Sequence, residues 1–134
     1  MKSFVDQGKH NESLLTHLKT TFPDKYNDWK ITVLFYSSIH YLKAYAALNK
    51  KNIGVTHHEI FLNTDSHNRN ATFPIQKGAY ILYKDIYQYS RTARYNGMID
   101  AASFEVLMKA DFEECEKNFD KFKKFLISKR VPIT

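Results

Sequence analysis

The segment "DWKITVLFYSSIHYLKAY", residues 28–45, sets the architecture expected of this chain. Its apolar side chains recur every three or four positions, which is the spacing of an α-helix. Together with the residues that follow as far as Leu48, this spacing gives three stripes: Ile31, Leu34, Ser38, Tyr41, Tyr45 and Leu48; Trp29, Val33, Tyr36 and His40; and Phe35, Ile39, Leu42 and Ala46. A helix that is apolar nearly all round is packed on several sides. We therefore predict a central helix over residues 24–49.

The sequence on either side of this segment predicts further helices. A first helix is expected over residues 3–22, ended by Pro23. Thr56 and Glu59 have the spacing of a capping box, in which each residue satisfies a backbone N–H of the other. This box predicts a short helix over residues 57–63.

Two more long helices are expected in the second half of the chain. One begins near residues 73–74, with Pro74 in its first turn, and the Asn-Gly pair at 96–97 ends it. After a loop, the Asp-x-x-Glu pattern at 111–114 is a second candidate capping box for the last helix. The apolar stripe of that helix is Met108, Phe112, Cys115, Phe119, Phe122 and Leu126. We therefore predict an all-α, antiparallel, up-and-down bundle of four main helices with short extra helices.

The composition agrees with a single helical domain over residues 1–134. Only 4 residues are glycine and 3 are proline, too few for a turn-rich β-fold. The net charge of +6 permits contact with nucleic acid or acidic partners. The lone Cys115 cannot form an internal disulfide and is expected to be buried and inert. No apolar run is long enough for a membrane, and no signal core is seen at the start, so we expect a cytoplasmic protein.

Arginines and tyrosines gather in "YKDIYQYSRTARYNG", residues 83–97. The chain has only four arginines, and two of them, Arg91 and Arg94, lie near the end of this helix. With Tyr83, Tyr87 and Ser90, Arg94 forms a stripe rotated by about 100° from the apolar stripe. One interpretation is packing and capping, because cations complement the C-terminal end of a helix. The other is a cradle in which guanidinium groups bind phosphate and tyrosine rings stack on a base.

Histidines are the remaining candidates for chemistry. His40, on the central helix, has the spacing of a core residue, but its polar neighbours also favour a hydrogen-bond network. His57 and His58 are adjacent and diverge by about 100° on a helix, so they do not aim at one ion. No Cys–His spacing indicates zinc, and no glycine-rich phosphate loop is present. We therefore expect no metal and no cofactor.

Three segments together resemble the HEPN superfamily of small helical domains: residues 28–45, "THH" at 56–58, and "YKDIYQYSRTARY" at 83–95. The likeness is to bacterial single-domain members and covers about residues 28–125. It implies a helical bundle that forms a homodimer. It also implies either RNA cleavage or a non-catalytic binding role in toxin–antitoxin or phage-defence systems, often beside a nucleotidyltransferase partner.

The chain lacks the motif that marks the nuclease members, an arginine followed four to six residues later by a histidine. Its last histidine is His67 and its first arginine is Arg69. Three hypotheses follow: binding of RNA or a nucleotide, a metal-independent ribonuclease with a rearranged site, and a protein-interaction module. For a ribonuclease, the candidate catalytic residues are His40, His57 and Arg94. For ligand binding, the candidates are Arg91, Arg94, Tyr87, Tyr95 and Tyr36.

Overall fold

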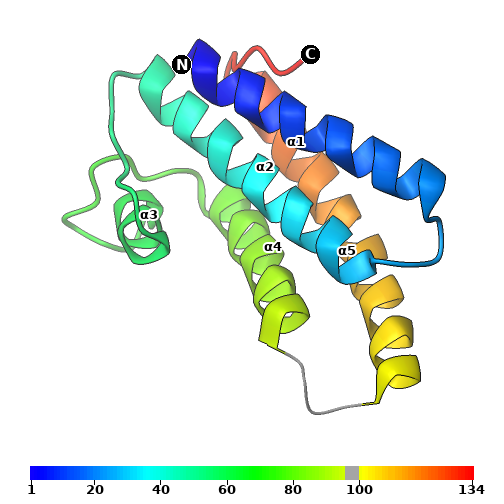
Figure 1. Cartoon of the computed structure of the whole chain (residues 1–134). Helices are drawn as coiled ribbons and strands as arrows, with labels where there is room; N and C mark the ends of the chain where they lie inside the picture. Colours follow the sequence, from blue (N-terminus) through cyan, green and yellow to red (C-terminus); the bar gives the residue numbers. More distant parts are fainter. Residues whose placement is uncertain (96–99) are drawn as a thin grey trace.

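The computed structural model describes residues 1–95 and 100–134, and these residues contain five helices and no strand (Figure 1). The all-α class is therefore confirmed. None of these helices is long and apolar enough to cross a membrane. In chain order they are α1 (Lys2–Thr21), α2 (Asn27–Leu48), α3 (His57–Thr64), α4 (Lys77–Tyr95) and α5 (Ala101–Ser128).

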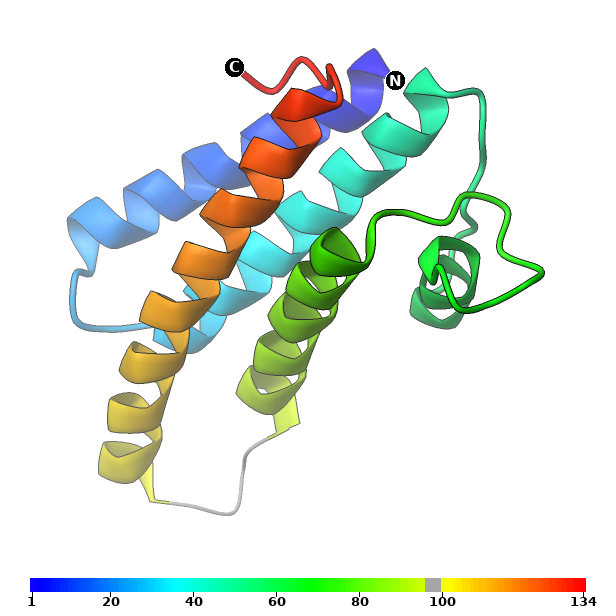
Figure 2. The same ribbon diagram turned by 180° about the vertical axis from the view of Figure 1, so that it is seen from behind.

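α2 is the central helix, as its sequence predicts. It packs against α1, α4 and α5, and the back view shows α5 lying between α1 and α4 (Figure 2). The stripe of Phe35, Ile39, Leu42 and Ala46 is buried, and so is the stripe that starts at Ile31 as far as Tyr41, whereas Leu48 at its end is exposed. The third stripe differs from the expectation of a helix packed on nearly every side, because Trp29 and Tyr36 expose 60% and 42% of their surface. α2 thus presents one aromatic face to solvent.

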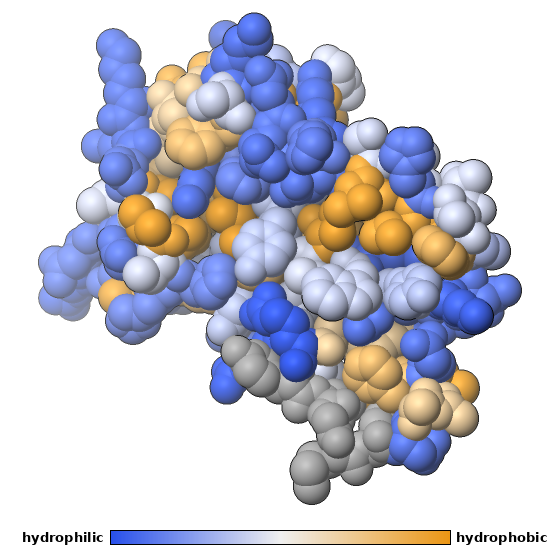
Figure 3. All heavy atoms as spheres, in the orientation of Figure 1, coloured by the Kyte–Doolittle hydropathy of each residue, from blue (hydrophilic) through white to orange (hydrophobic). Residues whose placement is uncertain are grey.

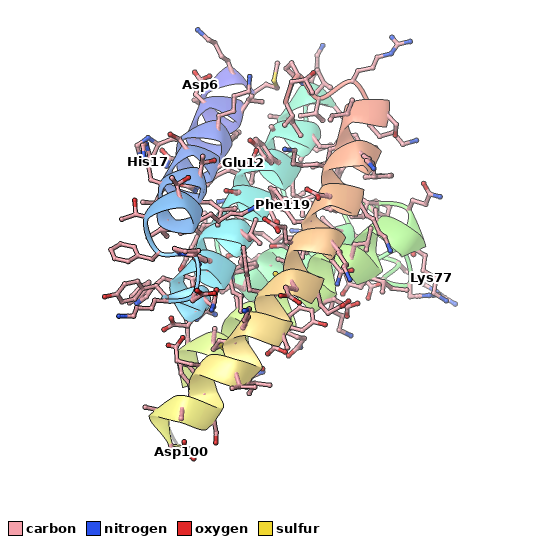
Figure 4. All side chains as sticks on the ribbon, turned by 90° about the vertical axis from the view of Figure 1, so that its right-hand side faces the viewer. Asp6, Glu12, His17, Lys77, Asp100 and Phe119 are labelled. Carbon is pink, nitrogen blue, oxygen red and sulfur yellow. The ribbon has the colours of Figure 1, made fainter. Side chains whose placement is uncertain are left out.

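α1 packs against α2 at Gly8. A Cβ atom there would clash with Cε1 of Tyr41, so the ring leaves no room for a side chain. Tyr41 is fully buried, its hydroxyl donates a hydrogen bond to Glu12, and its ring stacks on Phe119 of α5. Glu12 also accepts a hydrogen bond of 2.9 Å from Nζ of Lys123. In Figure 4, Glu12 lies on the side of α1 that faces α5. Tyr41 therefore joins three helices.

α4 begins later than the sequence predicts, and the placement of Pro74 in its first turn is wrong. The backbone on either side of this proline is bonded to the end of α3. The N–H of Phe73 donates to the carbonyl of Asn63 at 2.9 Å, and the N–H of Ile75 donates to the carbonyl of Thr64 at 3.1 Å. These bonds hold the segment in a loop, so the helix starts only after it.

α5 begins earlier than the sequence predicts. Its N-cap is Asp100, whose carboxylate accepts a hydrogen bond of 2.9 Å from the N–H of Ser103. The Asp-x-x-Glu pattern at 111–114 is therefore not a cap, since it lies inside a helix of 28 residues. The apolar stripe predicted over 108–126 is buried along its length. The helix stop predicted at 96–97 lies outside the described residues.

α3 stands beside the bundle and starts at the predicted capping box, which is confirmed. The Thr56 hydroxyl accepts a hydrogen bond of 3.1 Å from the N–H of Glu59, and the Glu59 carboxylate accepts one from the N–H of Thr56. Phe61 meets Tyr87 of α4 edge-on, with ring centroids 4.9 Å apart. The cap and this ring contact hold the short helix against α4.

Gly8→Ala is expected to lower the free energy of unfolding by about 1–3 kcal/mol, the usual cost of overpacking a core. The added methyl group meets the Tyr41 ring, which the Glu12 hydrogen bond prevents from swinging away. This cost outweighs a gain in helix propensity of roughly 1 kcal/mol. Urea unfolding followed by circular dichroism measures the change.

Gly78→Ala is the matched control, because a Cβ at that position of α4 would meet no heavy atom within 4 Å apart from its chain neighbours and the adjacent backbone of the helix. This variant is expected to be as stable as wild type or more stable by up to about 1 kcal/mol. Equal stability of the two alanine variants would mean that Tyr41 does not restrict residue 8.

Candidate functional site

A cleft of about 670 Å³ lies where α2, α3 and α4 meet. Its lining side chains are Tyr36 from α2, His57 from α3, and Tyr87, Arg91 and Arg94 from α4. A volume of this size is in the range of small-molecule sites. On the face drawn in Figure 3, strongly hydrophilic side chains over the end of α4 adjoin a band of intermediate hydropathy over α2. The cleft thus combines cationic and aromatic groups.

The α4 wall of the cleft follows from helical spacing. Tyr87, Arg91 and Arg94 are four and three residues apart, so they share one face. Earlier on this side of the helix Tyr83 is fully buried, and so is Ser90, whose hydroxyl donates to the carbonyl of Tyr87 at 2.8 Å. Both arginines, in contrast, are exposed. This side of α4 is therefore buried at Tyr83 and reaches the protein surface at Arg91 and Arg94, near the end of the helix.

Phe35 is the buried ring around which the residues of the cleft gather. The ring centroids of His57 and Tyr87 lie 5.3 and 5.4 Å from the centroid of Phe35. Cζ of Arg94 lies 5.8 Å from the same centroid, within cation–π distance. One ring of α2 thus positions one residue of α3 and two of α4. Nothing in the sequence singles out Phe35, because it reads as an ordinary member of an apolar stripe.

His57 and His40 each contain a buried ring nitrogen without a hydrogen bond. The Nδ1 atoms of both have no partner among the described residues. Burial lowers the pKa of His57, and the positive charges of Arg94 and Lys43 lower it further. Burial and then Lys43 lower the pKa of His40. Both imidazoles are therefore mainly neutral at pH 7, and neighbouring positive charges lower the pKa of both.

This arrangement suits a ligand that carries phosphate and an aromatic ring. Arg91 and Arg94 each offer a planar fork of N–H donors that matches the spacing of phosphate oxygens. Tyr36 offers a flat, exposed ring on which a base can stack. A neutral His57 can accept a proton, as a general base must. Groups for binding and for proton transfer therefore meet in one cleft.

Two further candidate site residues, His40 and Tyr95, are not among these five. His40 lies one turn beyond Tyr36 on α2 but is not among the described residues that line the cleft. The side chain of Tyr95 lies outside the described part of the chain. Within that part, no group of three or more histidine, cysteine, aspartate or glutamate side chains is placed to hold a metal ion. Cys115 is buried, and burial raises the pKa of its thiol to about 12, so it stays protonated.

Comparisons with models of protein families, with curated proteins and with solved structures found no match to this chain. The geometry of the cleft therefore carries the functional interpretation, together with the resemblance of three sequence segments to HEPN domains.

The free energy of unfolding is expected to fall as the pH is lowered through 6.5, the ordinary pKa of histidine. The unfolded chain protonates His40 and His57 in this range, whereas the lowered pKa values keep them neutral in the folded chain. The unfolded state then binds more protons, and stability decreases with pH. Urea unfolding between about pH 7.5 and pH 5.5, above the range in which ordinary carboxylates titrate, measures the decrease.

His57→Gln and His40→Gln are each expected to make this decrease smaller. His10→Gln is the control, because His10 is exposed on α1. The same pH dependence in all three variants would contradict the role given to the two buried imidazoles.

Proposed function

We propose that this chain binds RNA at the cleft between α2, α3 and α4, with Arg91 and Arg94 on the phosphates. The observation that carries the proposal is that two of only four arginines line one cleft together with tyrosine rings. Guanidinium groups beside aromatic rings are the combination by which proteins hold unpaired nucleotides. Tyr36 and Tyr87 frame the bound nucleotide, and His57 forms the polar wall of the pocket.

The charges around the cleft favour an anionic ligand. Arg94 and Lys43 act on His57, and no carboxylate of the described residues is among the groups that shift its pKa. A phosphate group offsets this positive field and accepts hydrogen bonds from the arginine N–H groups. The net charge of +6 adds a longer-range attraction for a polyanion.

The resemblance to HEPN domains supports the same proposal. The three segments that carry it, 28–45, 56–58 and 83–95, belong to α2, the start of α3, and α4, which are the helices that line the cleft. We propose that the four long helices form an up-and-down, HEPN-like bundle in a single domain over residues 1–134. In this proposal the domain acts in the cytoplasm as a homodimer, with a nucleotidyltransferase as a candidate protein partner.

Arg91→Ala/Arg94→Ala is expected to weaken the binding of an RNA oligonucleotide by at least about 10-fold, because each charge-assisted hydrogen bond contributes roughly 1.5–3 kcal/mol. The slope of log affinity against log salt concentration should become shallower by about 1.4, or roughly 0.7 for each lost phosphate contact with a single strand. Fluorescence anisotropy of labelled RNA over a salt series measures both quantities.

Arg69→Ala/Arg130→Ala is the matched control, because it removes the same two charges from exposed arginines outside the cleft. It is expected to cause only the small loss that follows from a lower net charge. An equal loss in both double variants would show a general charge effect instead of a site. Absence of RNA binding by the wild-type chain would replace this proposal with the protein-interaction role.

A metal-independent ribonuclease is the second candidate function, favoured by the position of His57 in the same cleft as both arginines. A neutral imidazole can take the proton of a ribose 2′-hydroxyl as a general base. The 2′-oxygen then forms a bond to the adjacent phosphorus, the bond from phosphorus to the 5′-oxygen breaks, that oxygen takes a proton from water, and a 2′,3′-cyclic phosphate remains. A guanidinium group can stabilise the negative charge that develops on the phosphate. The residues meet through folding and not through the order of a sequence motif, which is sufficient for acid–base chemistry.

This second candidate predicts RNA cleavage in the presence of excess chelator. His57→Ala and Arg94→Ala should each slow cleavage by about 100-fold or more, the usual contribution of a positioned acid or base. Gel electrophoresis of labelled RNA measures the rate. Cleavage that persists in both variants would contradict the catalytic roles given to His57 and Arg94. Cleavage that persists in His40→Ala would show that His40 is not a catalytic residue.

A further inference from the structure

Trp29 is the only tryptophan of the chain, and it exposes 60% of its surface on α2. Folding gains little from an indole ring that stays in water, because the hydrophobic effect scales with the apolar area removed from water. The ring is large, rigid and flat, which suits stacking against another aromatic surface. Its exposed face is therefore available to a ligand.

Trp29 and Tyr36 stand on the same face of α2. They are seven positions apart in the sequence, which is two helical turns and about 10.5 Å along the axis. Val33, between them on this stripe, exposes only 9% of its surface. The two rings therefore project on either side of a buried residue. Tyr36 belongs to the cleft that holds the arginines, and Trp29 extends the aromatic surface two turns toward the start of α2.

We infer that the ligand is single-stranded RNA of more than one nucleotide, laid along this face of α2 with one base on Tyr36 and another on Trp29. The inference rests on the proposed function, because Arg91 and Arg94 hold the phosphates of the same strand. The two residues are about 10.5 Å apart along the helix axis, roughly three times the 3.4 Å spacing of stacked bases, so different nucleotides of one strand and not a single base are expected to reach the two rings. Trp29 is not among the residues that line the cleft, so a mononucleotide bound there is not expected to contact it.

The chemistry of this face favours a single strand over other occupants. A duplex keeps its bases in its own stack, where exposed rings cannot reach their faces, whereas a single strand presents a π-face at every base. The arginines beside the rings complement a phosphate backbone. A second copy docked by this same face would bring Arg91 and Arg94 of both copies to one interface, where like charges repel, so the homodimer proposed above is expected to use another face.

Trp29 reports on this contact directly, because no other tryptophan contributes to the fluorescence. We expect an oligouridylate of about ten nucleotides, within the site sizes of single-strand binders, to change the Trp29 emission. The midpoint of that change should match the affinity measured by anisotropy of the labelled oligonucleotide. Uridine monophosphate should bind without changing the emission, and an RNA duplex of equal length should bind more weakly than the single strand.

Trp29→Ala should weaken oligouridylate binding by roughly 5- to 150-fold, the range expected for the loss of one base–aromatic stack. Its affinity for uridine monophosphate and the salt dependence of its RNA binding should stay as in wild type. Trp29→Phe should retain most of the affinity, since it keeps a ring. Leu14→Ala is the control for loss of an exposed apolar side chain, because Leu14 exposes 48% of its surface on α1.

The outcomes separate this inference from the proposed function. If Trp29→Ala binds oligouridylate as tightly as wild type while Arg91→Ala/Arg94→Ala does not, the inference is overturned and the proposed function stands. If the wild-type chain binds no RNA, both are wrong. If Trp29→Ala changes the oligomeric state in light scattering but not the RNA affinity, the face belongs to a second copy, and the inference is again overturned.

Discussion

α1 can lie against α2 only because residue 8 has no side chain. The ring of Tyr41 occupies that space, and its contacts with Glu12 and Phe119 place α1 and α5 on two sides of the central helix. Burial raises the pKa of Tyr41, and the hydrogen bond to Glu12 raises it further, so the hydroxyl stays protonated and continues to donate. α4 covers another side of α2. The side that remains is the one with the exposed aromatic rings, so the packing at Gly8 also determines which face is left for a ligand.

The cleft exists because α3 contacts the rest of the bundle through aromatic side chains. Close backbone contacts join α1, α2, α4 and α5 in pairs, whereas α3 meets its neighbours through His57 and Phe61. Large rings between two helices keep their axes further apart than small side chains do. Hydrogen bonds from the side chain of Asn63 to Ile53, and from the backbone of Phe73 back to Asn63, hold the flanking loops. α3 is thus fixed at a distance that leaves space in front of the arginines.

Periodicity in the sequence is sufficient to predict a helix and its buried residues wherever the helix has one buried face, as α5 does over 108–126. Helix boundaries are harder to predict, because the deciding bonds join distant residues or resemble patterns that occur elsewhere. Pro74 has the position of a first-turn proline, yet the backbone around it is bonded to α3. An Asp-x-x-Glu pattern inside α5 looks like a cap, while the true cap is Asp100. For the site, helical spacing brings the arginines of α4 onto one face, but the role of Phe35 depends on rings from two other helices.

Nδ1 of His57 is buried without a hydrogen bond from the described residues, and this unfavourable arrangement is the reason to connect the residue with function. A buried nitrogen without a hydrogen bond costs stability, and a phenylalanine at this position could pack on Phe35 and Tyr87 without that cost. Departures of this kind from the rules of core packing are expected at functional sites. Phosphate in the cleft would oppose the positive field of Arg94 and so raise the pKa of His57, and by linkage protonation of His57 would strengthen phosphate binding by the same factor. In the proposed function, phosphate binding and acid–base chemistry would therefore be coupled at this site, because a phosphate held by the arginines would also make the imidazole a stronger base.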